Sequence, residues 1–186
     1  MKLDISRLEA LFRGHGHTLY GGEAISQTEH ALQCATLAEH AGESDALITA
    51  ALLHDIGHFV MAESGIVDMR HQDVAANALT ETFSESVTGP IQLHVAAKRY
   101  LCAVEATYWE GLSQASKDSL VLQGGPYDAA GVAAFEQNPH YAAAVRLRRY
   151  DDAAKVVGAV TPSLDHFLGK IGSLQRTSHR AEHAQQ

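Results

Sequence analysis

The sequence has few cysteines and no run of apolar residues long enough to span a bilayer. Cys34 and Cys102 are its only thiols in a chain of 186 residues, which excludes a disulfide scaffold. No stretch reaches the roughly 18 consecutive apolar residues of a membrane-spanning helix. The start, MKLDISRLEALFRGHG, has an early acid and lacks the apolar region of a signal peptide. We therefore expect a cytoplasmic protein with no membrane partner.

Positive charge is also scarce. The chain has 14 Lys and Arg residues against 22 Asp and Glu, which gives a formal net charge of -8. Proteins that bind nucleic acid usually present a broad cationic surface to the phosphate backbone, and this composition does not supply one. We therefore expect no nucleic acid partner.

Strand patterns are missing as well. Alternating β-branched runs do not occur, alanine is abundant, and apolar residues recur at helical spacing through most of the chain. We predict an all-α protein, a single helical bundle over residues 1–171 that is followed by a polar, flexible tail over residues 172–186. After a first helix near residues 5–12, the expected helices cover 28–41, 44–60 without interruption, 70–82, 84–103 with a break or bend near Gly89 and Pro90, 113–121, 129–136, 139–154 and 162–171.

Histidine, in contrast, is abundant, with 12 residues. The most informative stretch is LLHDIGHFV at 52–60, where polar side chains interrupt an apolar run. Burying such a group without a partner costs a few kcal/mol. His54 and His58 share one face of a regular helix, whereas Asp55 points about 100° away from His54. If a metal is the partner, other helices must therefore contribute ligands.

Ligand-type residues recur singly on successive predicted helices. In chain order they are His30, His54 with Asp55, His71, His94 and Asp151. This order, H…HD…H…H…D, resembles the HD-domain superfamily, and the two intervening histidines resemble those of its dinuclear members. The resemblance implies two metal ions with Asp55 as the bridge, because one carboxylate offers an oxygen to each ion.

The ligand types narrow the choice of metal. Four imidazoles with two carboxylates suit iron, zinc, manganese or cobalt better than magnesium or calcium, which prefer oxygen. Two such ions against two carboxylates leave a net positive centre, which would attract a small anion even in an acidic protein.

A narrower resemblance lies in the flanking segments. These are YGGEAISQTEHALQCA (20–35), AALLHDIGH (50–58), HVAAKRYL (94–101), LSQAS (112–116), QGGP (123–126) and RRYD (148–151). Together they are similar to the HD-domain mixed-valent di-iron oxygenases of the PhnZ type. The resemblance implies cleavage by dioxygen of the carbon-phosphorus bond of 2-amino-1-hydroxyethylphosphonate, giving glycine and phosphate, with an Fe(II)/Fe(III) pair as cofactor. An N-trimethyl substrate that would give glycine betaine stays open.

The resemblance also implies residues that hold the phosphonate. Lys98 lies one turn beyond His94 and faces the same way. With Ser116 and Arg148 it would bind the phosphonate oxygens. Taken without the resemblance, Lys98 fits a solvated surface lysine and Ser116 a helix cap.

Two further residues receive roles from the same resemblance, and His58 receives a role from its position on the helix face of His54. Glu23 would accept the cationic nitrogen of the substrate, and Tyr20 would form a lid that occupies an iron site until substrate displaces it. His58 would contact the substrate or support a ligand rather than bind a metal itself, although a histidine buried in the core fits the sequence equally well.

Two other functions fit parts of this pattern. An HD-domain phosphohydrolase, which acts on a nucleotide or phosphate monoester through metal-activated water, needs the same basic ligands but no redox-active iron. A signalling module without catalytic activity would have the same fold. The extra histidine pair and the YxxE and HVAAK segments favour the oxygenase, and signalling modules have usually lost ligands that this chain keeps.

Overall fold

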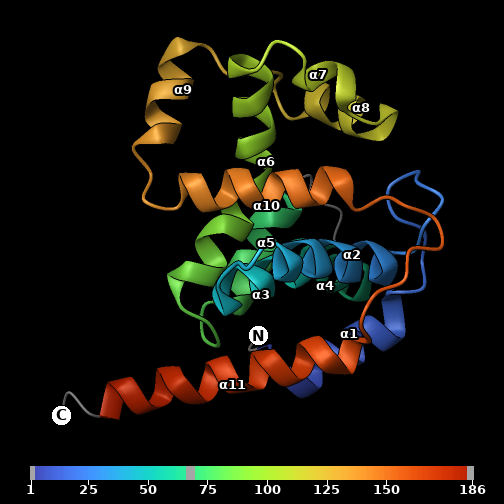
Figure 1. Ribbon diagram of the computed structural model, residues 1–186, viewed down its shortest axis with the longest axis vertical. Helices are drawn as coiled ribbons and strands as arrows, with labels where there is room; N and C mark the ends of the chain where they lie inside the picture. Colours follow the sequence, from blue (N-terminus) through green and yellow to red (C-terminus); the bar gives the residue numbers. More distant parts are fainter. Residues whose placement is uncertain (1–2, 66–69, 184–186) are drawn as a thin grey trace.

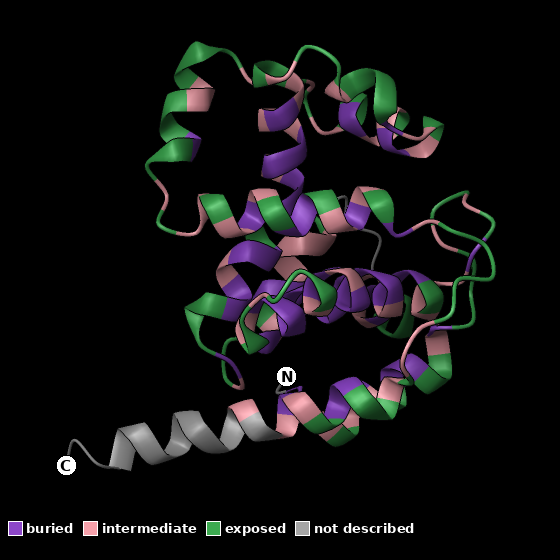
Figure 2. Ribbon diagram, viewed as in Figure 1, coloured by how far each residue is buried: buried purple, intermediate pink, exposed green. Residues whose placement is uncertain are grey.

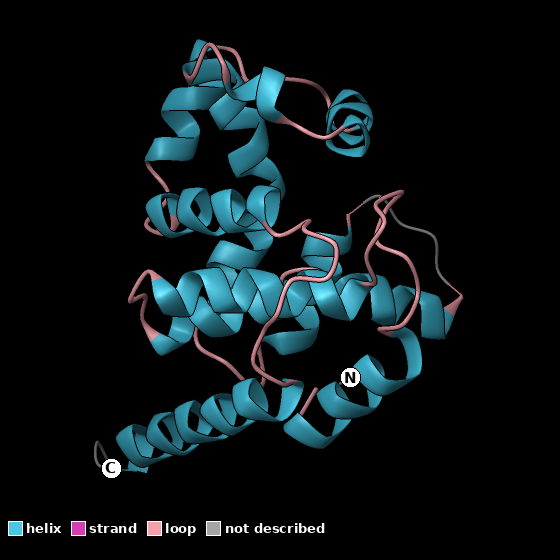
Figure 3. Ribbon diagram, turned by 45° about the vertical axis from the view of Figure 1, so that its right-hand side comes forward, coloured by secondary structure: helices cyan, strands magenta, loops and turns pink. Residues whose placement is uncertain are grey.

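The computed structural model describes residues 3–65 and 70–183, with residues 173 and 175–183 described by their backbone alone. Within these ranges the chain is helical, and it forms no strand beyond one isolated bridge between Leu19 and Ser26 (Figures 1 and 3). The predicted all-α class is confirmed. The helices are α1 Ile5–His15, α2 Gln27–His40, α3 Asp45–Leu53, α4 Ile56–Ser64, α5 His71–Leu79, α6 Glu85–Val104, α7 Tyr108–Gly111, α8 Gln114–Leu122, α9 Ala129–Glu136, α10 Tyr141–Ala153 and α11 Leu164–His183.

Helix starts follow from capping side chains. Ser26 and Glu29 form a reciprocal capping box at α2, and Ser44 accepts a hydrogen bond from the backbone N–H of Leu47 at α3. Ser113 caps α8 in the same way, by accepting from the N–H of Ser116. The cap of α8 is therefore Ser113, which leaves the side chain of Ser116 available for another role.

The main core is built around α3. This helix is apolar on every side and packs against α2, α6, α10 and α11 (Figure 2). Leu53 is fully buried, and burying a leucine side chain contributes roughly 1.5–3 kcal/mol. The segment Asp45–Ser64 is long and apolar enough on average to cross a membrane, but 72% of its most apolar window is buried inside the fold. Packing in the core therefore accounts for this hydropathy.

The expected uninterrupted helix over 44–60 is wrong. Helix α3 ends at Leu53 and α4 begins at Ile56, and Asp55 between them has φ -101° and ψ 8°, outside the helical range. In a regular helix the side chains of His54 and Asp55 would diverge, whereas the interruption brings Asp55 Oδ2 within 3.3 Å of His54 Nε2. The break in the helix thus allows neighbouring residues to face one centre.

A break near Gly89 and Pro90 does not occur, because α6 runs without interruption from Glu85 to Val104, and the alternative of a bend there stays a prediction. Pro90 lies near the start of α6, where its missing N–H removes one helical hydrogen bond. The helix continues because its buried face packs against α3, α5 and α10.

Two features of the chain's second half were not in the sequence prediction. The single turn α7 precedes α8, and both lie beside the end of α6 that is remote from α11 (Figure 1). Helix α11 continues to residue 183, so most of the backbone of the expected tail is helical, and the domain boundary at residue 171 stays a prediction.

Candidate metal and substrate site

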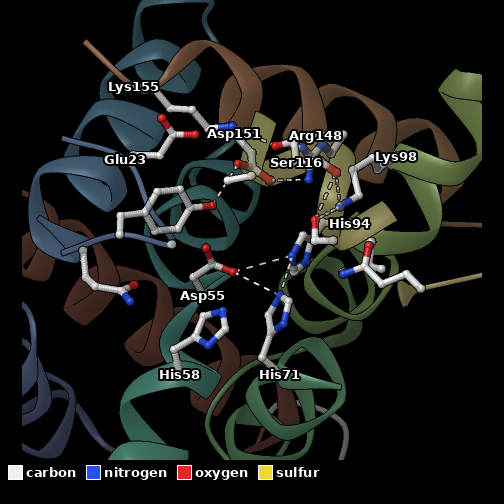
Figure 4. A pocket seen from close by; sticks show the side chains of 17 residues that line it. Glu23, Asp55, His58, His71, His94, Lys98, Ser116, Arg148, Asp151 and Lys155 are labelled. Atoms are coloured by element: carbon white, nitrogen blue, oxygen red, sulfur yellow. Dashed lines mark hydrogen bonds and ion pairs between the residues drawn. The ribbon is translucent and has the colours of Figure 1, made fainter. Parts of the chain in front are cut away.

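The predicted metal ligands meet at one buried point. They come from α2, the junction of α3 and α4, the start of α5, the middle of α6 and the last turn of α10. Figure 4 shows Asp55, His71, His94 and Asp151 of this set. His30 Nε2 lies 3.3 Å from His54 Nε2 and 3.4 Å from Asp151 Oδ1. His71 Nε2 lies 3.1 Å from His94 Nε2. The structure therefore brings together every residue that the sequence assigned to the metal centre.

Asp55 lies between the two histidine pairs. Its Oδ2 is 3.3 Å from His54 Nε2 and 3.9 Å from His30 Nε2. Its Oδ1 is 3.3 Å from His71 Nε2 and 3.6 Å from His94 Nε2. Each oxygen faces a different pair, which is the arrangement that a bridging carboxylate requires.

Backbone carbonyls orient three of the imidazoles. The Nδ1 atoms of His30, His54 and His94 lie 2.8, 2.9 and 2.7 Å from the carbonyl oxygens of Ala154, Ala51 and Ile91. An Nδ1–H that donates to a carbonyl leaves the lone pair of Nε2 directed at the centre, as in protein metal sites. Two such lone pairs face each other at 3.3 Å between His30 and His54, so a cation or a proton must lie between them.

The charges of these groups suit a metal. Burial raises the pKa of Asp55, but His54 and His71 outweigh it and hold the pKa well below its usual range. Arg148 and His30 do the same for Asp151. Burial lowers the pKa of His54, yet Asp55 and Asp151 prevail and raise it to about 9. A metal ion that displaces this proton would meet ionised carboxylates and directed imidazoles, so the donor set fits a transition metal.

A cavity of about 300 Å³ opens beside the metal centre. Every predicted substrate-binding residue lines it, as do Asp55, His71, His94 and Asp151 of the centre. The predicted set comprises Lys98, Ser116, Arg148, Glu23, His58 and the lid residue Tyr20. A small molecule in this cavity would contact both the metals and the cationic side chains.

Lys98 and Arg148 form the cationic wall of the cavity. Lys98 is 2% exposed and donates to Ser119 Oγ at 2.6 Å and to the carbonyl oxygen of Ser116 at 3.4 Å. Burial and the nearby Arg148 lower its pKa to about 8. Arg148 pairs with Asp151 at 2.8 Å and with Asp152. The surface alternative for Lys98 does not hold, since this lysine is buried.

The loop before α2 covers the opposite side of the cavity. Tyr20 donates from its hydroxyl to Asp151 Oδ1 at 3.3 Å, and its ring stacks on His30 with centroids 3.8 Å apart. Gly21 and Gly22 have positive φ angles, which let the chain turn directly after Tyr20. Glu23 Oε1 is buried and has no hydrogen-bond partner among the described residues. A cationic or N–H group of a ligand would satisfy it.

Comparison with known proteins identifies the family. The HD domain family matches residues 28–100, which include all the predicted ligands except Asp151. The chain is 47% identical to the hydroxymethylphosphonate dioxygenase of Gimesia maris over 175 residues, 91% of this chain and 87% of the relative. It is 41% identical to the [1-hydroxy-2-(trimethylamino)ethyl]phosphonate dioxygenase (glycine-betaine-forming) of Leisingera caerulea over 185 residues, 91% of this chain and 94% of the relative. The chain belongs to the HD-domain phosphonate dioxygenases.

A further relative extends the family beyond bacteria. The uncharacterized protein L432 of Acanthamoeba polyphaga mimivirus is 32% identical over 171 residues, 88% of this chain and 78% of the relative. The predicted resemblance to the HD-domain phosphonate dioxygenases is thus confirmed for most of the chain.

His58 lies beside the predicted metal ligands of this HD-domain phosphonate dioxygenase. Its ring stacks on His71 with centroids 4.2 Å apart, and it faces the cavity (Figure 4). Burial lowers its pKa, which favours a neutral imidazole. It is placed to support the His71 ring and to contact a ligand.

Two residues that line the cavity were missed in the sequence. Ser119 accepts the hydrogen bond from Lys98, and Lys155 donates to Ser116 Oγ at 3.1 Å. Helical spacing could have indicated Ser119, which lies three residues after Ser116 on α8. No such signal applies to Lys155, because α10 ends at Ala153, before that residue.

Proposed function

We propose that the protein is a mixed-valent di-iron oxygenase that uses dioxygen to cleave the carbon-phosphorus bond of a 1-hydroxyphosphonate and releases phosphate. The observation that carries the proposal is the juxtaposition of two histidine pairs around Asp55 with Lys98 and Arg148 in one cavity. Such a cavity offers metal sites for an oxygen substituent and cations for an oxyanion. The names of the relatives, both phosphonate dioxygenases, support iron as the metal, since dioxygen chemistry requires a redox-active ion.

The ligands would divide between two iron ions, Fe(II) and Fe(III). His30, His54 and Asp151 would hold one ion, His71 and His94 the other, and Asp55 both. When bound, the pair supplies redox chemistry toward dioxygen and polarises the C1 hydroxyl of the substrate. No side chain then has to act as a strong base.

The protein's own side chains hold the substrate. Lys98, Arg148 and the hydroxyl of Ser116 would bind phosphonate oxygens by charge-assisted hydrogen bonds, worth roughly 1.5–3 kcal/mol each. Tyr20 contacts Asp151 and His30 at the centre, and would have to swing away when the substrate enters. Its aromatic ring would then help to exclude water from the closed cavity.

The substituent on C1 distinguishes the candidate substrates. The carboxylate of Glu23 would pair with the cationic nitrogen of 2-amino-1-hydroxyethylphosphonate or of its trimethylammonium analogue. Cleavage of these two substrates would give glycine and glycine betaine, respectively. Hydroxymethylphosphonate, named for one relative, has no such group. Its cleavage by one molecule of dioxygen yields formate and phosphate, and atoms and electrons balance without another reductant.

Oxygen uptake by the iron-loaded protein tests the proposal. We expect an EPR signal from the mixed-valent pair, and phosphate release coupled to oxygen consumption with at least one of the three phosphonates. A protein without redox-active iron that hydrolyses phosphate monoesters in the absence of oxygen would instead be the phosphohydrolase. A metal-bound protein with neither phosphonate oxygenase nor phosphohydrolase activity would point to the signalling module.

A further inference from the structure

Three cationic side chains converge on Ser116, and one of them has no part in the function proposed above. Lys98 donates to the Ser116 carbonyl, whereas Arg148 Nη2 and Lys155 Nζ both donate to its Oγ, at 3.4 and 3.1 Å. Lys155 lines the same cavity (Figure 4). We propose that Lys155 is a positioning residue that directs the hydroxyl hydrogen of Ser116 toward a phosphonate oxygen and supplies a further cation to the phosphonate site.

The hydrogen-bonding capacity of the hydroxyl supports this role. A serine hydroxyl has two acceptor lone pairs and one hydrogen to donate. Arg148 and Lys155 occupy both lone pairs of Ser116 Oγ. Within the described residues no hydrogen bond is donated by this hydroxyl, so its hydrogen is free for a ligand. Two cationic donors also polarise the O–H bond, which strengthens its bond to an anion.

The charge around the site gives Lys155 a second effect. Arg148 is paired with Asp151 and Asp152, so much of its charge is already offset. Lys98 and Lys155 have no carboxylate oxygen within 4.0 Å among the described residues. In Figure 4 Lys155 lies on the same side of the cavity as Glu23, without an ion pair between them. The two lysines therefore match the two negative charges of a phosphonate dianion.

This inference rests on the proposed function for its substrate, but inorganic phosphate tests it separately. Phosphate presents the same oxygens as a phosphonate, so its binding to the iron-loaded protein can be measured by calorimetry without turnover. We expect Lys155→Met to weaken phosphate binding about 10-fold to 100-fold, the range for losing a charge-assisted hydrogen bond, at unchanged iron content. Lys155→Arg, which keeps a cationic donor, should restore most of the affinity.

Lys117 provides the matched control. It is adjacent to Ser116 in sequence, but its ammonium group points away, to the carbonyl of Glu110 and the ring of Trp109. Lys117→Met removes one positive charge from the residue next to Ser116. It should leave the phosphate affinity within about twofold of that of the parent protein. An equal loss in Lys117→Met and Lys155→Met would mean that net charge alone is responsible, and would overturn the inference.

A double-mutant cycle tests the link to Ser116. If Lys155 acts through the hydroxyl, Lys155→Met should cost clearly less affinity in a Ser116→Ala background than in the parent protein. In turnover with the best phosphonate, the same variant should raise KM far more than it lowers kcat. Wild-type phosphate affinity in Lys155→Met, or losses that multiply fully in the double variant, would refute the positioning role. A wild-type protein that binds phosphate but turns over no phosphonate would refute the proposed function alone.

Discussion

Gly57 faces the backbone of His71 so closely that a Cβ atom at position 57 would lie 2.0 Å from the His71 carbonyl oxygen. Real Cβ atoms do not approach a backbone oxygen to that distance, so only glycine lets the start of α5 pack here against α4. This contact sets how far the His71 side chain reaches into the metal centre. The glycine of the LLHDIGHFV motif is thus linked to a ligand from the next helix.

We expect Gly57→Ala to displace the start of α5 and remove the ion held by His71 and His94, while the ion held by His30, His54 and Asp151 is retained. Metal analysis should show iron falling from two ions toward one per chain, and the coupled mixed-valent EPR signal should disappear. Gly14→Ala is the control, because nothing lies within 4 Å of the added methyl group. Two fully retained ions in Gly57→Ala would contradict this account.

Asp55→Ala should remove both ions. The two oxygens of Asp55 face different histidine pairs, so truncation would take one anionic ligand from each ion. It would leave only two imidazoles at one site, and two imidazoles with Asp151 at the other. The ion of the His30, His54 and Asp151 site and the ion of the His71 and His94 site should be lost together. The measurement is the amount of iron per chain after gel filtration. Asp152→Ala, which removes the neighbouring carboxylate that pairs with Arg148, should keep its iron. A variant at Asp55 that retained one full ion would argue against the bridge.

The pH dependence should report Lys98. Its pKa of about 8 means that Lys98 is charged below pH 8 and loses its charge as the pH rises through that value. We expect kcat/KM, which reflects the free enzyme, to fall above about pH 8 because the phosphonate loses a cationic partner. Lys98→Arg keeps its charge at all these pH values and should remove this alkaline limb. If kcat/KM of Lys98→Arg still fell above about pH 8, the fall would have to come from another titrating group.

Substitution of Glu23 should affect the candidate substrates differently. Glu23→Gln removes the negative charge from a buried oxygen that lacks a partner among the described residues. KM should rise about 10-fold or more for the two substrates with a cationic nitrogen and change little for hydroxymethylphosphonate, which carries no positive charge. Equal effects on substrates with and without the cationic nitrogen, measured by phosphate release, would place the nitrogen elsewhere.

Removing the metal should destabilise the whole fold. In the metal-free protein, ionised carboxylates and imidazole nitrogens face one another in the buried centre. Bound metal ions would satisfy these groups and so stabilise the fold. At free metal about a thousandfold above Kd, the stabilisation is about 4 kcal/mol, which for a chain of this length shifts Tm by about 8–16 °C. Differential scanning calorimetry of chelated and reloaded protein checks this, and equal Tm values would contradict it.

The helical periodicity predicted the all-α fold, and the order of ligand-type residues predicted the metal site. The ligand order, through its resemblance to the HD-domain superfamily, predicted that His30 and Asp151 lie together although 120 residues separate them. The interruption at His54 and Asp55 could not be foreseen, since the surrounding residues favour a continuous helix and only tertiary packing opposes it. Lys155 was missed for a related reason, because its direction depends on where α10 ends.

Helix α10 carries both Arg148 and Asp151, three residues and therefore about 4.5 Å apart along its axis. One helix thus holds a side chain that would bind the phosphonate oxygens and a ligand of one of the two proposed ions. Movement of the loops around the cavity leaves that spacing unchanged. The proposed function then has a geometric consequence: a substrate would have to present its phosphonate and its hydroxyl at the spacing that this helix fixes.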